Sequence, residues 1–218
     1  MPTIARTSTT RRAALGGLLA GLAGPVLAAG PKIVTMLGDS ITAGYGLVAA
    51  DAVPARLQAD LAALGAPAVV RAAGVSGDTT AGGLARVDFS VQADTALCLV
   101  ALGGNDLLQG LDPATTKANL FKIVSRLQAR KIAVILVGIA APSAIGAAYA
   151  REFNAVFPAV AKAKGVPLYP NILAGVSGNP QLIQRDGIHP NAAGAAIIAR
   201  RLAPVVTRSL KGPATRQY

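Results

Sequence analysis

The sequence predicts one α/β domain of three layers, with helices on both faces of a parallel sheet. Short apolar runs alternate with longer segments of helical periodicity from residue 30 to near the end of the chain. The apolar runs are continuous rather than interrupted by alternating polar residues, as expected for strands that are buried on both faces. A length of 218 residues suits a single domain with a full hydrophobic core. These observations favour a doubly wound α/β/α arrangement.

The predicted strands are the apolar runs that lie between glycine-rich or polar segments. Cys98, the single cysteine, falls in the third of these runs. It has no partner for an internal disulfide, so we expect an inert buried thiol. The five strands are expected at 32–37, 68–73, 95–102, 131–138 and 166–169.

The predicted helices fill the segments between the strands and carry typical end signals. Gly65 and Gly165 lie near the ends of two of them, and Asp112 and Pro113 fit the N-cap and first position of another. Pro190 suits the first position of the last helix. The five helices are expected at about 51–64, 79–87, 113–130, 147–164 and 191–210.

Residues 1–29 are expected to be a cleavable export signal. Arg6, Arg11 and Arg12 form a basic start without an acid, an apolar stretch follows, and small residues close the segment. The alternative is an N-terminal membrane anchor, for which the apolar stretch is short. The arginine pair is compatible with a twin-arginine signal, so that route and general secretion both stay open.

The mature protein is therefore expected in the periplasm or outside the cell. We expect its catalytic domain at 30–212 and a C-terminal tail at 213–218. Neither the composition nor the patterning of the chain indicates an oligomeric state.

The chain is basic, with a formal net charge of +11 at pH 7. Three of these charges belong to the predicted signal, so the mature chain would carry +8. A basic surface can attract an anionic membrane or anionic substrates, although a solvated last helix explains the same residues. A nucleic-acid partner is not expected for an exported protein. The basic residues near the end are Arg200, Arg201, Arg208, Lys211 and Arg216.

His189 is the one histidine of the chain, so any mechanism with an imidazole base must use it. Asp186, three residues upstream, can accept the Nδ1–H and hold the tautomer whose Nε2 accepts a proton. Ser40 follows the first predicted strand and offers a hydroxyl that such a base could activate. Each motif alone is also compatible with a surface turn. Together they indicate a serine hydrolase.

An acyl-transfer enzyme also needs hydrogen-bond donors for the oxyanion that develops during the reaction. The backbone N–H of Ser40 is one candidate, and the N–H of Gly77 in the loop after the second strand is another. Asn105 follows the third strand and offers a side-chain amide. The carboxyl ends of parallel strands share one edge of the sheet, so we expect these residues to lie on a common rim with His189. Taken singly, Gly77 is better explained as a turn glycine and Asn105 as a turn or capping residue.

Four blocks in order along the chain resemble the SGNH (GDSL) hydrolases, in particular the thioesterase I, arylesterase and lysophospholipase group. The resemblance covers 32 to about 203. It implies Ser40, Gly77, Asn105 and His189 as the four defining residues, with Asp186 completing the triad. It also implies a flavodoxin-like fold that uses no metal and no cofactor. The blocks are Gly38-Asp39-Ser40-Ile41 to Gly46, Ala73-Gly74-Val75-Ser76-Gly77-Asp78 to Arg86, Leu102-Gly103-Gly104-Asn105-Asp106 and Asp186-Gly187-Ile188-His189-Pro190-Asn191.

The resemblance implies an exported serine esterase that cleaves carboxylic esters or thioesters, such as aryl esters or lysophospholipids, through an acyl-enzyme on Ser40. The segment 141–146 lacks the Asn-Tyr-Gly common in this group, and its Ala, Ile and Pro predict an apolar wall for a fatty or aryl acyl group.

Two alternatives stay open, a carbohydrate O-deacetylase and a catalytically inactive periplasmic binding or accessory protein on the same fold. An α/β-hydrolase, a dinucleotide-binding protein and a metal enzyme are disfavoured. The chain has no Gly-x-Ser-x-Gly, no Gly-x-Gly-x-x-Gly after the first strand and no metal-ligand spacing.

Overall fold

The computed structural model describes residues 1–3 and 30–212. The predicted export signal lies outside the described residues apart from its first three, and the predicted tail lies outside them entirely. The described residues from Pro31 to Gly212 belong to one unit. No helix within the described part of the chain has the length and apolar character to cross a membrane.

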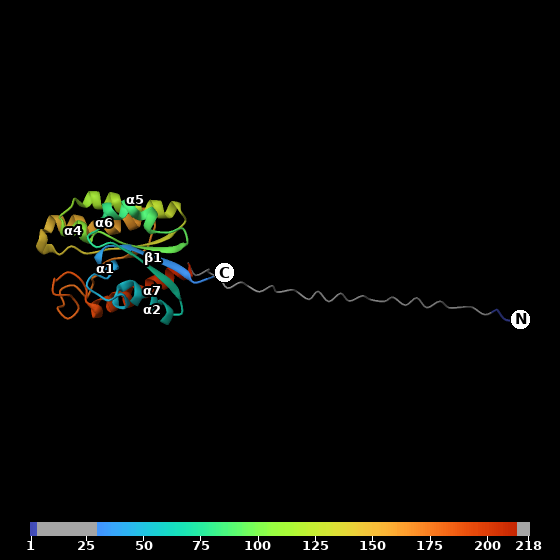
Figure 1. Ribbon diagram of the computed structural model, residues 1–218. Helices are drawn as coiled ribbons and strands as arrows, with labels where there is room; N and C mark the ends of the chain where they lie inside the picture. Colours follow the sequence, from blue (N-terminus) through green and yellow to red (C-terminus); the bar gives the residue numbers. More distant parts are fainter. Residues whose placement is uncertain (4–29, 213–218) are drawn as a thin grey trace. The chain divides into compact units, whose positions relative to one another are not determined.

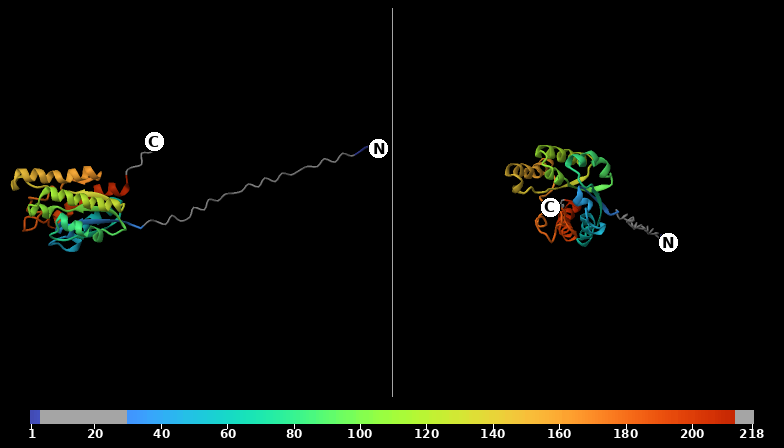
Figure 2. Two further views of the ribbon diagram at one scale, coloured as in Figure 1. Left: turned by 90° about the horizontal axis from the view of Figure 1, so that it is seen from above. Right: turned by 60° about the vertical axis from the view of Figure 1, so that its left-hand side comes forward.

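The centre of the domain is a five-stranded sheet in which every neighbouring pair of strands is parallel. The strand order is β2-β1-β3-β4-β5, which is the flavodoxin-like order and confirms the predicted fold class. Helices lie on both faces of the sheet (Figures 1 and 2). The strands are β1 (Lys32–Gly38), β2 (Ala68–Gly74), β3 (Thr95–Ala101), β4 (Ala133–Val137) and β5 (Leu168–Tyr169).

Five longer helices form the two outer layers. Helices α2 and α7 pack together on one face, and α5 packs between α3 and α6 on the other (Figure 1). They are α2 (Val53–Ala63), α3 (Thr80–Ser90), α5 (Pro113–Ala129), α6 (Ala147–Lys164) and α7 (Ala192–Lys211). The N-cap and first-position roles of Asp112 and Pro113 are confirmed, since the Asp112 carboxylate accepts from Ala114 N–H at 2.9 Å.

The sequence pattern missed two short helices and two 3-10 turns. Helices α1 (Ser40–Ala43) and α4 (Gly104–Leu108) follow β1 and β3 directly, and η1 (Ala49–Asp51) and η2 (Ser143–Ile145) lie in loops. Four or five residues are too few to show a helical period. Both short helices begin at the carboxyl edge of the sheet, so Ser40 and Asn105 follow the ends of two neighbouring strands, β1 and β3.

The last helix starts later than predicted. Pro190 is not its first residue, because α7 begins at Ala192 and Asn191 is the N-cap. The Asn191 side chain accepts from the Gly194 N–H at 3.1 Å and so satisfies a donor that has no partner inside the helix. Pro190 instead forms an isolated antiparallel bridge with Ile183.

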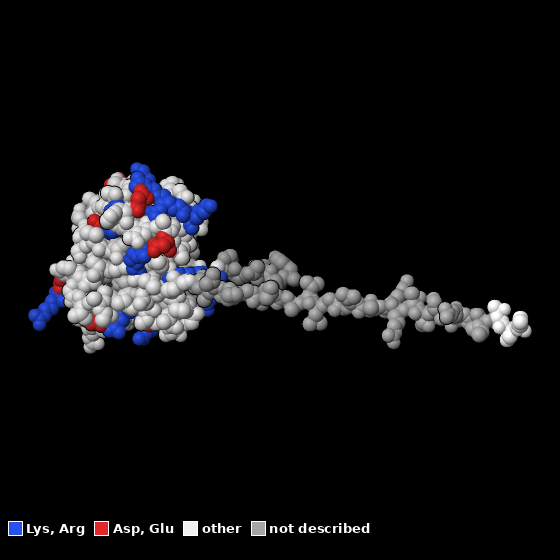
Figure 3. Space-filling view, turned by 45° about the vertical axis from the view of Figure 1, so that its right-hand side comes forward, with Lys and Arg blue, Asp and Glu red and all other residues white. Residues whose placement is uncertain are grey.

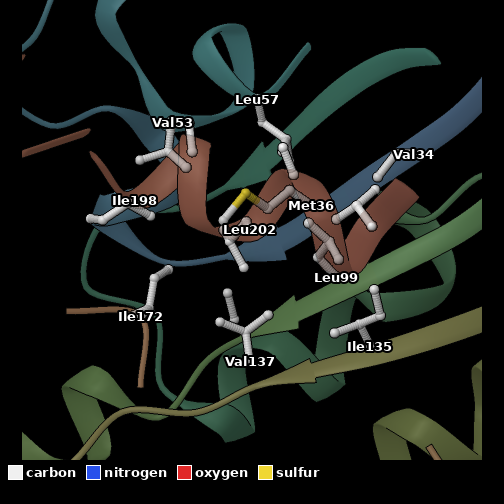
Figure 4. Packing of buried hydrophobic residues seen from close by; sticks show 14 of the residues in the cluster. Val34, Met36, Val53, Leu57, Leu99, Ile135, Val137, Ile172, Ile198 and Leu202 are labelled. Carbon is white, nitrogen blue, oxygen red and sulfur yellow. The ribbon is translucent and has the colours of Figure 1, made fainter. Parts of the chain in front are cut away.

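The hydrophobic core consists of one cluster on each face of the sheet. The cluster under α2 and α7 joins Met36 and Leu99 of the sheet to Leu57 and Leu202 of the helices (Figure 4). The cluster under α3, α5 and α6 contains Cys98, which is fully buried as predicted. Burial raises the pKa of its thiol to about 12, so the thiol stays protonated and unreactive.

Basic and acidic side chains are mixed on the surface. On the face in Figure 3, Lys and Arg gather over the layer that holds α5 and α6, with Asp and Glu among them. The carboxylate of Asp88, for example, lies between two arginines, with Oδ2 at 3.3 Å from Nη1 of Arg126 and Oδ1 at 3.6 Å from Nη1 of Arg130.

Candidate active site

Ser40 lies at the first position of α1, directly beyond the carboxyl end of β1. Asp39 is the N-cap of this helix, and its carboxylate accepts from the Ile41 N–H at 3.1 Å. Ser40 is 8% exposed and lines a cavity of the domain. Gly74 is required beside it, because a Cβ there would lie 2.3 Å from the backbone nitrogen of Ala43. The close approach of β2 therefore fixes the turn that carries Ser40.

The structure brings Ser40, His189 and Asp186 together in one chain of hydrogen bonds. The Nε2 of His189 lies 2.8 Å from the Ser40 Oγ, and its Nδ1 lies 2.6 Å from Oδ2 of Asp186. An ionised carboxylate only accepts, so Nδ1 donates to Asp186 and Nε2 accepts from the Ser40 hydroxyl. This is the tautomer that a general base requires.

Asp186 is held mainly by its own loop. Its Oδ1 accepts from the backbone N–H groups of Ile188 and His189 at 2.9 and 3.0 Å. These backbone bonds and the imidazole lower the pKa of the carboxyl to about 2. The carboxylate is therefore ionised at neutral pH, and its 35% exposed side chain keeps part of its hydration.

Asn105 lies on α4 and lines the same cavity as Ser40. Its Nδ2 donates to the carbonyl oxygen of Asp78 at 2.8 Å. A primary amide carries two N–H groups, so one remains for another acceptor. The bond to Asp78 also joins α4 to the loop that contains Gly77.

Gly77 lies in the loop after β2, in a turn where the Asp78 N–H donates to Val75 O at 3.1 Å. Its φ of +85° requires glycine, since other residues rarely adopt that conformation. No described atom lies within 4 Å of where its Cβ would be, so crowding by the protein does not explain this glycine. Among described residues the lining of the cavity includes Asn105 but not Gly77.

Two charged residues within the four sequence blocks, Asp106 and Arg86, connect the segments around the site, although no local pattern indicated a role for them. Asp106 is 1% exposed and accepts from the Thr80 N–H at 2.8 Å and from the Thr116 hydroxyl at 3.1 Å. It thereby ties α4 to the starts of α3 and α5. The guanidinium of Arg86 donates a hydrogen bond to Gly38 O at 2.8 Å. It also donates to Ala73 O and to the Asp78 carboxylate. The position of Asp106 directly after Asn105 was the only signal in the sequence.

Asp39 is a second carboxyl beside the reacting groups. It is 5% exposed, and burial raises its pKa to about 6, although the hydrogen bond from Ile41 and the nearby His189 act in the opposite direction. Asp78 adds a smaller repulsive contribution. Near neutral pH the buried carboxyl is therefore close to its own titration.

A cavity of about 430 Å³ opens beside Ser40, His189 and Asn105. Its size lies within the range of small-molecule sites. Ala141 and Pro142 contribute to one wall, so part of the predicted apolar segment 141–146 does line the site. Asn171 and Ser177 contribute polar side chains to the lining of the cavity. The apolar lining includes Ile41, Leu107, Leu108, Ile139, Ala140, Leu173 and Ile188. In the described part of the chain, no three His, Cys, Asp or Glu side chains are grouped to hold a metal ion.

Comparison with known proteins places this site in a family. Residues 36–197 match the model of the GDSL-like lipase/acylhydrolase family. The chain is 39% identical over 166 residues to the esterase TesA of Pseudomonas aeruginosa, covering 76% of this chain and 83% of TesA. It is 38% identical over 184 residues to thioesterase 1/protease 1/lysophospholipase L1 of Escherichia coli K12, covering 82% and 87% of the two chains.

A solved structure has the same fold. The SGNH-hydrolase family esterase AlinE4 superposes with a TM-score of 0.70 at 41% identity, covering 85% of this chain and 99% of AlinE4. The chain therefore belongs to the GDSL-like lipase/acylhydrolase family, the SGNH hydrolases, and is an ester-hydrolysing enzyme.

Proposed function

We propose that this enzyme is an exported esterase for apolar acyl esters, acting through an acyl-enzyme on Ser40. The observation that carries the proposal is the hydrogen-bonded chain from Ser40 through His189 to Asp186 at the mouth of an apolar cavity. A hydroxyl is a weak nucleophile, and an imidazole within hydrogen-bond reach is the usual means of activating it. Asp186 would orient the ring and stabilise the imidazolium.

In the first half-reaction, the Ser40 Oγ forms a bond to the acyl carbon while its proton passes to the Nε2 of His189. The carbonyl π electrons move onto oxygen, and the oxyanion is held by the N–H groups of Ser40 and Gly77 and by the second amide N–H of Asn105. When the tetrahedral intermediate collapses, the bond to the leaving oxygen or sulfur breaks. The Nε2 proton of the imidazolium is transferred to that atom.

The second half-reaction uses the same groups with water as the nucleophile. His189 accepts a proton from the water as its oxygen bonds to the acyl carbon, and the same oxyanion donors act again. The proton then returns to the Ser40 Oγ as the ester bond to the enzyme breaks. The carboxylic acid leaves and the free serine is regenerated.

The cavity favours acyl groups larger than acetyl. Its walls are mostly aliphatic, and Leu108 and Ile188 reach both the cavity and solvent, with 60% and 41% exposure. Contact with these side chains would remove apolar surface of a fatty or aryl group from water. A sugar acetyl ester would find few polar partners there. The relatives in Pseudomonas aeruginosa and Escherichia coli, named as an esterase and as a thioesterase and lysophospholipase, support an apolar acyl substrate.

The test is a chain-length series on the purified mature enzyme. Aryl oxygen esters from acetyl to palmitoyl are compared with the matching thioesters, a lysophospholipid and an acetylated sugar, with Ser40→Ala as the blank. We expect oxygen esters of medium or long acyl groups to have the highest kcat/KM. Cleavage of the acetylated sugar alone would support the O-deacetylase alternative and contradict this proposal.

A pair of surface variants sharpens the test. Leu108→Ser should raise KM for long acyl esters about threefold or more and leave acetyl esters unchanged, because it removes apolar contact area at the cavity. Phe89→Ser is the matched control, since Phe89 is 89% exposed and does not line the cavity in the described structure. Equal effects of the two variants would show that the cavity does not hold the acyl group.

We also propose that residues 1–29 direct export and are removed. The basic start, apolar stretch and small-residue exit support this. N-terminal sequencing of the exported protein should begin near Ala29 or Gly30, and a start at Met1 would refute it. An enzyme outside the cytosol would meet lysolipids and other free esters rather than acyl-CoA.

A further inference from the structure

Tyr45 lies over the imidazole of His189, although nothing in the proposed chemistry requires it. The two ring centroids are 4.6 Å apart, and the planes are tilted by 39°. Tyr45 is 54% exposed, so burial in a core does not explain its position. The ring instead covers part of His189, whose side chain is only 17% exposed.

The backbone holds Tyr45 in this position. Its N–H donates to Ser40 O at 3.0 Å, so the segment is fixed to the start of α1. The flanking Gly44 and Gly46 have φ values of +76° and +72°, a conformation that glycine adopts without strain. These two glycines, one on each side of Tyr45, allow the chain to turn back toward the loop of His189.

Gln184 joins the segment of Tyr45 to the loop of His189. Its side-chain Nε2 donates to Tyr45 O at 2.7 Å and to Pro190 O at 2.9 Å, and its backbone N–H donates to His189 O at 2.8 Å. Gly46 is needed for this approach, because a Cβ there would lie 2.2 Å from the Oε1 of Gln184. One amide thus connects the loop after the nucleophile with the loop of the base.

We propose that Tyr45 and Gln184 are positioning residues for the base, which together keep His189 against Ser40 and stabilise the imidazolium that forms during turnover. This inference rests on the proposed roles of Ser40 and His189. Its physical basis is that an aromatic face attracts a cation, so the Tyr45 ring interacts more favourably with the charged imidazole than with the neutral one. An interaction that strengthens in the transition state raises kcat.

The position of both residues outside the cavity separates this role from substrate binding. In the described structure neither Tyr45 nor Gln184 lines the cavity beside Ser40. Their effect should therefore appear in kcat and not in KM.

The kinetic test compares Tyr45→Leu with Tyr45→Phe in the mature enzyme on one aryl ester. Leucine fills similar space without an aromatic face, whereas phenylalanine keeps the face and loses only the hydroxyl. We expect Tyr45→Leu to lower kcat about three- to tenfold with KM unchanged, and Tyr45→Phe to stay within about twofold of wild type. A rise in KM at constant kcat would make Tyr45 a substrate contact and overturn the proposal.

Gln184→Ala supplies a second variant that acts on the other half of the unit. It should lower kcat in the same way, and the double variant with Tyr45→Leu should lose little more than the worse single variant, because both act through His189. Fully additive losses would show two independent effects and contradict a shared role.

A spectroscopic measurement tests the contact without relying on activity. With a single histidine in the chain, proton NMR of protein without a histidine tag shows one set of imidazole C–H resonances. The Tyr45 ring current should shift them, and Tyr45→Leu should remove the shift whereas Tyr45→Phe should retain it. Unchanged resonances in Tyr45→Leu would overturn the contact. Full activity in Ser40→Ala with the shift intact would instead refute the catalytic proposal alone.

Discussion

Ser40 lies at the end of a buried strand, whereas His189 and Asp186 lie on an exposed loop before α7. The serine side of the rim is held by long-range contacts, including the buried Asp106 and the close approach of Gly74. The histidine side is held by the backbone N–H groups of Ile188 and His189, which donate to the Asp186 carboxylate, and by the side-chain amide of Gln184. The buried Asp106 on the first side should therefore contribute mainly to stability, whereas Asp186 and His189 on the second side should contribute mainly to activity.

His189→Ala tests this contrast with the largest expected effect. Activity should fall by about 10⁴-fold or more, because no second imidazole can replace the base. The Tm should stay close to that of the wild type, since the ring is not part of either core cluster. Steady-state kinetics and thermal unfolding check both halves, and activity within tenfold of wild type would refute the role of His189.

Two aspartate variants compare the sides directly. Asp186→Asn should lower kcat by about 10²- to 10⁴-fold, because an amide facing Nδ1 favours the wrong tautomer. Its stability should change by less than about 1 kcal/mol at this exposed position. Asp106→Asn should lower the free energy of unfolding by about 1–3 kcal/mol, because it leaves buried donors of Thr80 or Thr116 unsatisfied.

Denaturant unfolding and kcat for both aspartate variants decide the comparison. If Asp186→Asn proved the more destabilising of the two, the contrast between the sides would be wrong.

Asn105 lies on the serine side of the rim, but Asn105→Ala should lower activity more than stability. The loss of one oxyanion donor should lower kcat by about 10²- to 10³-fold with little change in KM. Some destabilisation is expected as well, because the bond to Asp78 O is lost. A large rise in KM at constant kcat would make Asn105 a substrate-binding residue instead.

The effect of Asp39→Asn on stability should depend on pH. The folded pKa of about 6 lies above the ordinary value of 3.8 for an aspartate, so the ionised carboxyl disfavours folding above about pH 6. Protonation removes this penalty as the pH falls from about 6 to about 4. Asparagine is uncharged and an equally good N-cap, so the variant should be more stable than wild type by about 1–3 kcal/mol near pH 8.

The gain from Asp39→Asn should vanish near pH 4, where both proteins carry a neutral side chain. Thermal unfolding at the two pH values measures it. If the variant were no more stable than wild type near pH 8, burial would not destabilise the ionised Asp39 carboxyl.

The contribution of Asp186 to stability depends on pH in the opposite direction. Because its pKa is lowered in the folded protein, the stability that it contributes is lost as the pH falls from about 4 toward about 2.

Much of the fold was predictable from the sequence because the strands are continuous apolar runs and the long helices have clear end signals. Ser40, Asn105 and His189 could be placed on one rim because parallel strands end at the same edge. The short helices that aim Ser40 and Asn105 were not predictable, since they have no period. The contacts of Tyr45 with His189 and of Asp106 with Thr80 join distant parts of the chain, which no local pattern encodes.

Reaction with an organophosphorus probe tests most directly the claim that Ser40 is a nucleophile activated by His189. Intact-mass and peptide analysis of the wild-type protein should show one adduct, located on Ser40, and Ser40→Ala should show none. His189→Ala should be labelled at least about 10³-fold more slowly while remaining folded. An adduct on another residue, or labelling of Ser40 at the same rate without His189, would contradict the account.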